Sequence, residues 1–482
     1  MADPQLRAEQ KFVLAIDGGS QSTKVHVIDG SGVLHATAQR PLRPSRYPAP
    51  GAVVHPDDDL WDSLRDACQQ ALAAFEGPVE DIVGVGLCTI RFCRALLRHD
   101  GTLAEPVLSW MDERVSRPYD GQSDDVAFVT TSSGYITNRL TGQRRDAGAN
   151  YQGLWPIDHR RGQWSHDPAL FEAAGMPRSM LFDLVEPGGL LGQITAVAAE
   201  ATGIPAGLPV FATANDKAVE ALGAGVNEHS VLLSLGTYIA SMTPGSSPVS
   251  TNSAYWVNSG SMPGSYLYES NGIRRGMWTV SWARDLFLSD AAVRPDGRSA
   301  EDVLGDEAAG VPPGSGGVMA LMDWLAPPDM TFRRGALLGF DGTQGRAHIY
   351  RAVLEGIALT MADNIEAMET ALGRTFEEIV VSGGGAKSNL MMQIVADVLR
   401  RPTRRTGLDG AAGLGSAVCA AVGAGLHPDW VRAVAAMVRS GQRFQPDHRS
   451  VEAYQPIRVA YRDLHSFTDP LFETLACAPV GA

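Results

Sequence analysis

The chain has 482 residues, of which 44% are hydrophobic and 20% are charged, and its formal net charge at pH 7 is −14. These values are typical of a soluble globular protein, and the length predicts two domains rather than a single core. The negative charge argues against a nucleic acid or an anionic membrane surface as a partner, because both would repel the chain at long range.

Cysteine usage and hydropathy argue against a disulfide-rich, a zinc-binding, a secreted or a membrane-spanning protein. The five cysteines are scattered and contain no CxxC pair, so neither a disulfide framework nor a structural zinc site is expected. Residues 1–11 lack the apolar core of a signal peptide. The two long uncharged stretches, residues 230–268 and 410–426, are too rich in small and polar residues to span a membrane, and the second predicts a tightly packed internal helix. We therefore expect a cytoplasmic protein with no membrane partner.

The first predicted element is a β-hairpin. Residues 12–16 form an apolar run that predicts a buried strand, residues 17–24 a loop rich in Gly and Ser, and residues 25–28 a second strand. The turn of such a hairpin exposes backbone N–H groups that can hold a phosphate. A second hairpin is predicted where a strand leads into Gly236 and Thr237 and back into a strand. Two units of one kind suggest two similar domains that face each other across a cleft.

Between the hairpins, the pattern predicts a helix at residues 61–75 and strands at residues 81–87 and 208–212. The last of these strands leads into a short helix at residues 218–222. Asp216 thus lies at a strand-to-helix junction, where a side chain either caps the helix or points into a cleft.

The second half of the sequence continues the alternation of helices and strands. An apolar stripe predicts a long helix over residues 349–372, and a strand at residues 379–381 leads into a glycine-rich loop at residues 382–389. The three consecutive glycines of this loop let the backbone approach a ligand closely, although such runs more often form an ordinary turn. Helices at residues 390–399 and 451–476 complete an α/β pattern.

Lysine is rare in this chain. Arginine supplies nearly all of the positive charge, and the only lysines are Lys11, Lys24, Lys217 and Lys387. Three of the four lie in or beside the loops described above. A retained lysine marks a position that needs a compact ammonium group, although biased codon usage explains the rarity equally well.

Two segments in the second half of the sequence form a distinctive pattern. Residues 335–340 read Gly-Ala-Leu-Leu-Gly-Phe, and after seven residues the segment 348–356 begins with His-Ile and ends with Ala-Val-Leu-Glu-Gly. This pattern resembles the carboxy-terminal signature of the FGGY carbohydrate kinases. The two hairpins and the loop 382–389 also occur in the order typical of this family. The resemblance therefore extends over residues 11–425.

The resemblance implies an α/β fold in which two actin-like (RNase H-like) domains face each other across a catalytic cleft. They are assigned to residues 11–226, expected to bind substrate and phosphate, and to residues 227–476, expected to bind the nucleotide. The implied reaction is ATP-dependent phosphorylation of a primary hydroxyl of a small sugar, such as a pentulose, or of a polyol, with ATP and Mg²⁺ as cofactors. The oligomeric state stays open, although members of the family are often homodimers.

The resemblance also implies roles for individual residues. Asp216 matches the catalytic base, and Asp17 matches the acidic residue that positions the metal and the phosphoryl group. Phosphoryl transfer needs these parts, because in-line positioning, a metal ion, backbone donors and one carboxylate provide most of the catalysis. The implied phosphate and nucleotide contacts are Gly19, Ser20, Gln21, Lys24, Gly236, Thr237, Gly384, Gly385 and Asn389. The implied substrate contacts are Arg91, Trp110, Asp216 and Lys217.

Three substrate contacts have alternative structural interpretations. Arg91 would otherwise be a salt-bridged surface arginine, and Trp110 a core aromatic. Lys217 would otherwise be a solvated lysine in the first turn of a helix. Beside the base, a lysine would instead lower the pKa of Asp216 and favour its ionised form.

Three features depart from the family. Residues 89–92, Thr-Ile-Arg-Phe, stand where xylulose kinases have Gln-Met-His-Gly. The stretch near 115–133 is short and lacks the family's amino-terminal signature, which predicts a pocket that is more open or is completed by a partner subunit. Lys217 stands where relatives more often have a neutral polar residue. Two alternative functions stay open: a sugar-binding regulator that has the kinase fold without turnover, and an actin-like ATPase that acts on a protein partner.

Overall fold

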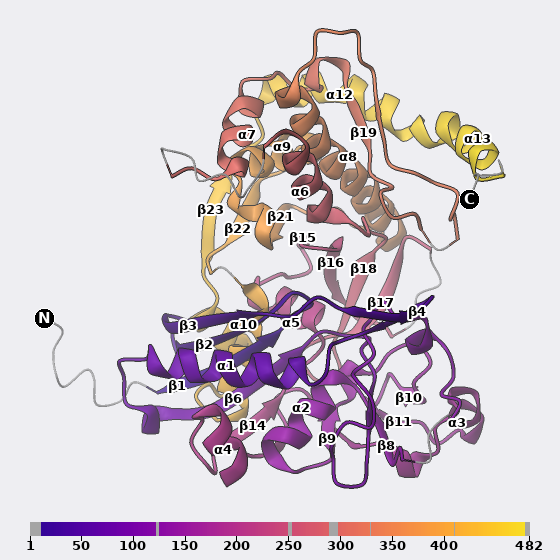
Figure 1. Cartoon of the computed structure of the whole chain (residues 1–482). Helices are drawn as coiled ribbons and strands as arrows, with labels where there is room; N and C mark the ends of the chain where they lie inside the picture. The colour runs from indigo at the N-terminus through magenta and orange to yellow at the C-terminus, as the bar shows by residue number, and fades with distance from the viewer. Residues whose placement is uncertain are drawn as a thin grey trace, which may run out of the picture.

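The computed structural model describes residues 11–121, 125–248, 253–288, 297–327, 329–408 and 410–477. Two large β-sheets dominate these residues, and they lie one above the other in Figure 1 with helices packed against both. The part built on the lower sheet is called the first half below, and the part built on the upper sheet the second half.

The first half contains a six-stranded sheet in the order β13-β14-β6-β1-β2-β3. β1 pairs antiparallel with β2 and parallel with β6, and β6 pairs parallel with β14. The strands are β1 (Phe12–Gly18), β2 (Ser22–Asp29), β3 (Leu34–Pro41), β6 (Ile82–Thr89), β13 (Leu190–Gln193) and β14 (Pro209–Ala212). The first predicted hairpin is confirmed as β1 and β2.

Helices from distant parts of the chain cover the two faces of this sheet. Leu14 of β1 packs in a hydrophobic cluster with α1 (Asp59–Ala73), whereas its neighbour Val13 packs in a second cluster with α10 (Ala411–Gly423). The two-residue period of a strand sends these neighbours to opposite faces. The predicted internal helix at residues 410–426 is confirmed as α10, and it packs on the first half although it lies in the chain between β22 and β23 of the second sheet.

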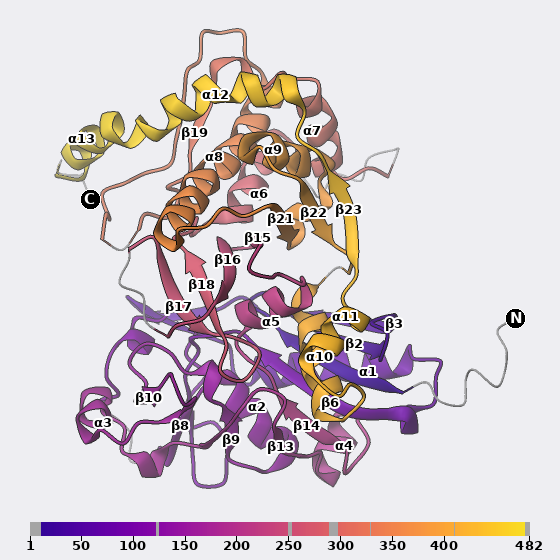
Figure 2. The same ribbon diagram turned by 180° about the vertical axis from the view of Figure 1, so that it is seen from behind.

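The helix α5 (Asp216–Gly223) lies between the two halves (Figure 2). On one side it packs against α10, where a Cβ on Gly223 would lie 1.9 Å from the backbone oxygen of Ala411. On the other side Ala218 shares a cluster with Leu232 and Val380 of the second sheet. The absence of a side chain at Gly223 therefore lets α5 fit closely between α10 and the second half.

The second half contains a seven-stranded sheet in the order β17-β18-β16-β15-β21-β22-β23. The long helix α8 (Arg346–Leu372) supplies much of the hydrophobic core beside this sheet. The strands are β15 (Ser230–Leu235), β16 (Ile239–Gly245), β17 (Tyr255–Ser259), β18 (Tyr266–Ser270), β21 (Glu378–Ser382), β22 (Thr403–Thr406) and β23 (Ser440–Phe444). The second predicted hairpin is confirmed as β15 and β16.

Shorter elements complete the described residues. The other strands are β4 (Arg46–Ala49), β5 (Ala52–Val54), β7 (Ala95–Leu97), β8 (Phe128–Thr130), β9 (Arg145–Ala147), β10 (Ile157–Asp158), β11 (Gln163–Trp164), β12 (Asp183–Val185), β19 (Met319–Leu321) and β20 (Ala336–Leu338). The other helices are α2 (Ser132–Thr141), α3 (Pro168–Ala174), α4 (Ala196–Thr202), α6 (Gly276–Phe287), α7 (Ala300–Ala309), α9 (Asn389–Leu399), α11 (Trp430–Met437), α12 (His448–Arg462) and α13 (Leu464–Cys477). No helix among the described residues is both long and apolar enough to cross a membrane.

The single final helix predicted at residues 451–476 is wrong, because the chain forms α12 and α13 there and α12 ends before Asp463. The two helices are fixed to different parts of the molecule. Tyr461 of α12 donates a hydrogen bond to the carbonyl of Ala320, whereas Asp469 of α13 pairs with Arg333. Part of the short stretch near 115–133, namely residues 122–124, lies outside the described residues.

Candidate active site

A cavity of about 1010 Å³ lies between the two halves, and residues of both halves line it. Twelve of the residues that the sequence singles out are in its wall: Asp17, Gly19, Ser20, Gln21, Lys24, Arg91, Trp110, Asp216, Lys217, Gly236, Thr237 and Gly384. Gly385 and Asn389 are not in the wall. Gly385 is buried against Leu235, and the side-chain oxygen of Asn389 accepts a hydrogen bond from Arg405.

The two glycine turns face each other across this cavity. One turn joins β1 to β2 and contains Gly19 and Gln21, and the other joins β15 to β16 and contains Gly236 and Thr237. Gln21 Nε2 donates a hydrogen bond to Thr237 Oγ1 at 2.8 Å. The two turns predicted to hold phosphate are therefore in direct contact, one from each half.

Asp216 is the first residue of α5, and its side chain is free of any capping role. Asn215 is the N-cap instead, and its side-chain oxygen accepts from the backbone N–H of Ala218 at 3.0 Å. Among the described residues Asp216 Oδ1 is buried without a hydrogen-bond partner, and Arg91 Nε lies 3.8 Å away. Burial raises the pKa of Asp216, while Arg91 and Lys217 lower it. The Asp216 side chain is 24% exposed and lines the cavity, although Oδ1 itself is buried and faces Arg91.

A divalent cation fits beside Asp17. Asp17 lies near the end of β1 opposite Lys24 of β2, and burial raises its pKa to about 6 although Lys24 lowers it. Among the described residues no three His, Cys, Asp or Glu side chains form a cluster that could hold a metal ion. Mg²⁺ does not need one, because it keeps several waters and is held by one or two carboxylates together with phosphates. The half-buried carboxylate of Asp17, which lines the cavity together with both glycine turns, fits that requirement.

Arg91 forms an ion pair that crosses from the first half to the second. Its Nη1 and Nη2 donate to the two carboxylate oxygens of Glu269 at 2.7 and 2.8 Å. Glu269, on β18, is fully buried and also accepts from Asn258 Nδ2 at 2.8 Å. The guanidinium carbon lies 4.8 Å from the ring centre of Trp256 and 5.1 Å from that of Phe92. Arg91 is thus salt-bridged, as in its alternative interpretation, but the ion pair is buried inside the cleft rather than on the surface.

Trp110 and Lys217 have structural contacts as well as a place in the cavity wall. Trp110 is half-buried and packs against the core of the first half. The side chain of Lys217 is only 13% exposed, and its Nζ donates to Glu220 at 3.0 Å and to Ser234 at 2.7 Å. The interpretation of Lys217 as a solvated lysine is therefore wrong.

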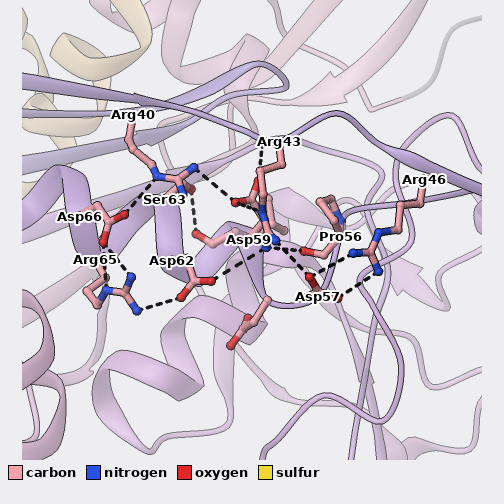
Figure 3. Close-up of polar contacts among 12 residues, drawn as sticks. Arg40, Arg43, Arg46, Pro56, Asp57, Asp59, Asp62, Ser63, Arg65 and Asp66 are labelled. Atoms are coloured by element: carbon pink, nitrogen blue, oxygen red, sulfur yellow. Dashed lines mark hydrogen bonds and ion pairs between the residues drawn. The ribbon is translucent and has the colours of Figure 1, made fainter.

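A charged network holds one edge of the cavity. Gln39 and Pro41, at the end of β3, line the cavity, and the residues around them are attached to the start of α1 (Figure 3). Asp59 is fully buried and accepts from the backbone N–H of Arg43 at 2.7 Å and from Arg40 Nη1 at 3.3 Å. Because it is buried and held by several donors, Asp59 keeps the end of β3 in place at the cavity.

Sequence reasoning missed Glu269, Trp256 and Glu220 as parts of this site. Trp256 and Glu269 are register partners on β17 and β18, so they meet Arg91 only through long-range strand pairing. One signal was present, since Glu269 is the first charged residue after the uncharged stretch 230–268. A single charge at the end of such a stretch indicates a buried partner of opposite sign.

Comparisons with known proteins decide the family. The sequence pattern described as the FGGY family of carbohydrate kinases, C-terminal domain, matches residues 231–424, and that of the N-terminal domain matches residues 12–123 and 115–223. The chain belongs to the FGGY family of carbohydrate kinases. The resemblance seen in the sequence is confirmed, and the enzyme is a carbohydrate kinase.

Relatives match this FGGY kinase over nearly its whole length. It is 45% identical over 470 residues to the uncharacterized sugar kinase YgcE of Escherichia coli (strain K12), covering 96% of this chain and 95% of that protein. It is 28% identical over 517 residues to the glycerol kinase of Dechloromonas aromatica (strain RCB), covering 96% of this chain and 99% of that protein. Both relatives thus share its full extent.

Solved structures of FGGY-type kinases share the fold. The xylulose kinase from Rhodospirillum rubrum superimposes with a TM-score of 0.79 at 25% identity, covering 96% of this chain and all of that one. The gluconate kinase from Lactobacillus acidophilus gives a TM-score of 0.82 at 17% identity and covers 97% of this chain. The expected α/β fold of two actin-like halves is confirmed.

Proposed function

We propose that this FGGY kinase transfers the γ-phosphoryl group of ATP to a primary hydroxyl of a small sugar or polyol, with Asp216 as the catalytic base. The observation that carries the proposal is the position of Asp216. Its half-buried carboxylate, with a buried Oδ1 that lacks a hydrogen-bond partner among the described residues, lines one cavity with both glycine turns. A hydroxyl placed there lies between a proton acceptor and the backbone donors that hold phosphate.

In this proposal each residue has a separate role in phosphoryl transfer. Asp216 accepts the hydroxyl proton while a bond forms between the acceptor oxygen and the γ-phosphorus, and the bond from that phosphorus to the bridging oxygen of ADP breaks. The N–H group of Gly19 closes its own turn on the carbonyl of Ser22, so the phosphate donors we propose are the N–H groups of Ser20, Gln21, Gly236 and Thr237. They would face the phosphates, where negative charge accumulates. Bound Mg²⁺ would neutralise part of that charge, and Asp17 would hold it, with Lys24 nearby.

The acceptor end of the cavity favours a small uncharged sugar or polyol. Trp110 and Trp256 offer flat apolar surfaces to carbon-bound hydrogens of such a molecule. Arg91 has two of its donors committed to Glu269, so its charge is balanced before the acceptor binds. We propose a pentulose as the first acceptor to test. The names of the relatives, glycerol kinase and xylulose kinase, span both classes of acceptor.

Further assignments extend this proposal. Gly384, Gly385 and Asn389 are the proposed contacts of this loop with the nucleotide, and Gly384 is the one of the three in the cavity wall. Lys217 stays a candidate for contact with the acceptor. We propose residues 11–226 and 227–476 as the two domains, with α10 returning to the first. We also propose a cytoplasmic enzyme, and a homodimer is the assembly to test.

The proposal is tested by measuring ADP release with and without a panel of pentuloses, hexuloses and polyols. Release that depends on one acceptor, with a phosphorylated product, is the expected result. Release that is independent of every acceptor would instead indicate an ATPase acting on another partner. Binding of an acceptor without any release of ADP would indicate a regulator without turnover. Either of the last two results would overturn the proposal.

A further inference from the structure

One buried carboxylate of the cavity has no part in the reaction described above. Glu220 lies four residues after Asp216 on α5, so both side chains project from the same face of the helix. The side chain of Glu220 is only 13% exposed and lines the cavity. A carboxylate in such a place needs partners, because an unpaired buried charge is costly.

The partners of Glu220 belong to the other half of the molecule. Its Oε1 accepts hydrogen bonds from the hydroxyl groups of Ser382 at 2.5 Å and Ser234 at 2.8 Å. These serines are register partners on the parallel strands β21 and β15. One carboxylate on a helix attached to the first half thus spans two neighbouring strands of the second.

Both serines directly precede the turns that line the cavity. Ser234 stands two residues before Gly236, which begins the turn between β15 and β16. Ser382 stands directly before Gly383, which begins the glycine-rich loop after β21. Gly236 and Gly383 are both in the cavity wall. A displacement of either serine therefore moves the backbone at Gly236 or Gly383 in the cavity wall.

The contacts of Glu220 involve charged groups. Although burial raises the pKa of Glu220, Lys217 and the serine hydroxyls bring it below its ordinary value. Although burial lowers the pKa of Lys217, Glu220 and Asp216 raise it above its ordinary value. Hydrogen bonds to an ionised carboxylate are about twice as strong as those between neutral groups. The connection between the halves is accordingly a strong one.

Asp216, by contrast, has no hydrogen bond to Oδ1 among the described residues. Its orientation follows that of α5, and Glu220 ties α5 to the glycine turns. We propose that Glu220 is a positioning residue, whose carboxylate fixes α5, and with it Asp216, against the two turns that hold the nucleotide phosphates. This inference rests on the proposed function, in which Asp216 is the base.

A double-mutant cycle between Glu220 and Ser382 tests the inference. The variants E220Q, S382A and E220Q/S382A are assayed for kcat and for the KM of the acceptor. In E220Q, kcat falls by about 10- to 100-fold, because a small displacement of a reacting group has an effect of that size. The acceptor KM changes less than about threefold, since no acceptor contact is removed. In the double variant kcat equals that of E220Q, because both changes remove one shared contact.

The matched control is S241A. Ser241 is a buried serine of the same sheet, and its hydroxyl donates to Ser270 at 2.8 Å outside the cavity wall. S241A retains the kcat of the original enzyme, so loss of a buried hydroxyl alone does not explain the effect. If E220Q does not fold, the variant S234A/S382A provides the test, since it leaves every charge in place. It lowers kcat while its midpoint of thermal unfolding stays close to that of S241A.

Two results would overturn the role of Glu220. The first is a kcat of E220Q/S382A that is reduced by the product of the factors found in E220Q and in S382A. The second is a kcat of S234A/S382A equal to that of S241A. D216N is measured alongside to separate this role from the proposed function. Full activity of D216N would overturn the proposed function itself. An inactive D216N together with either result above would overturn only the role of Glu220.

Discussion

Arg91 and Glu269 join the two halves of the kinase through a two-bond ion pair, in which both carboxylate oxygens of Glu269 accept from the guanidinium group. The pair is covered by Trp256, and Arg91 Nε lies 3.8 Å from the candidate base Asp216. It therefore joins the two halves directly beside the candidate base.

We expect R91A to destabilise the fold as well as the reaction. Removal of Arg91 leaves the fully buried Glu269 without its positive partner, which costs about 3 kcal/mol of unfolding free energy. Urea unfolding of R91A and of R91A/E269Q measures this cost. The double variant recovers part of the loss, because its residue 269 carries no charge. Equal stability of the two variants would contradict the account.

The contact between the glycine turns predicts an effect on nucleotide binding. Gln21 Nε2 donates to Thr237 Oγ1, and we expect Q21A and T237A each to raise the KM of ATP by about 2- to 10-fold, the usual worth of one hydrogen bond. The KM of the acceptor stays unchanged, and steady-state kinetics measures both constants. Q70A, which changes an exposed glutamine on α1, is the control and behaves like the original enzyme. A larger change in the acceptor KM than in the ATP KM would count against the assignment.

The buried carboxylates predict the acid side of the pH profile. Burial raises the pKa of Asp17 to about 6 and raises that of Asp216, and both must be ionised for activity. Acceptor-dependent kcat/KM is therefore high well above pH 6 and is lost as the pH falls through about 6. A higher Mg²⁺ concentration moves this loss to lower pH, since a metal ion favours the ionised carboxylate. A pH profile that stays the same at every Mg²⁺ concentration would contradict the role of Asp17.

Stability also depends on pH through His26. This histidine of β2 is buried beside α10, and burial, aided by Lys24, lowers its pKa to about 4 from 6.5. The unfolded chain binds more protons than the folded one between these values, so the stabilisation is present above pH 6.5 and is lost as the pH falls. The contribution of His26 alone is a loss of about 2 kcal/mol between pH 7 and pH 5. Urea unfolding of the original enzyme and of H26Q at both values measures it, as the difference between their pH dependences.

Local sequence patterns predicted the elements that surround the cavity. An apolar run followed by glycines identified both hairpins, because these residues determine strand and turn without long-range contacts. The junction between a strand and a helix likewise singled out Asp216, as either a helix cap or a side chain that points into a cleft. Both predictions depend on residues that are neighbours in the chain, which is why the pattern was sufficient.

Contacts between the halves could not be predicted in this way. The serines that meet Glu220 stand far apart in the sequence and become neighbours only when β15 pairs with β21. The position of α10 on the first half is another case, since its composition predicts burial but not the surface that buries it. The hydrogen bond that Asn389 accepts from Arg405 is a further case, since the two residues meet only when α9 packs beside β22.

The most direct test of the account is the rate of phosphoryl transfer by D216N to the best acceptor of the panel, with ATP and Mg²⁺ at saturating concentrations. Asparagine keeps the size of the side chain but accepts no proton. The account predicts a fall in kcat of about 100- to 10,000-fold, the usual contribution of a general base, with unfolding stability retained. A D216N enzyme that transfers phosphate at the original rate would contradict it.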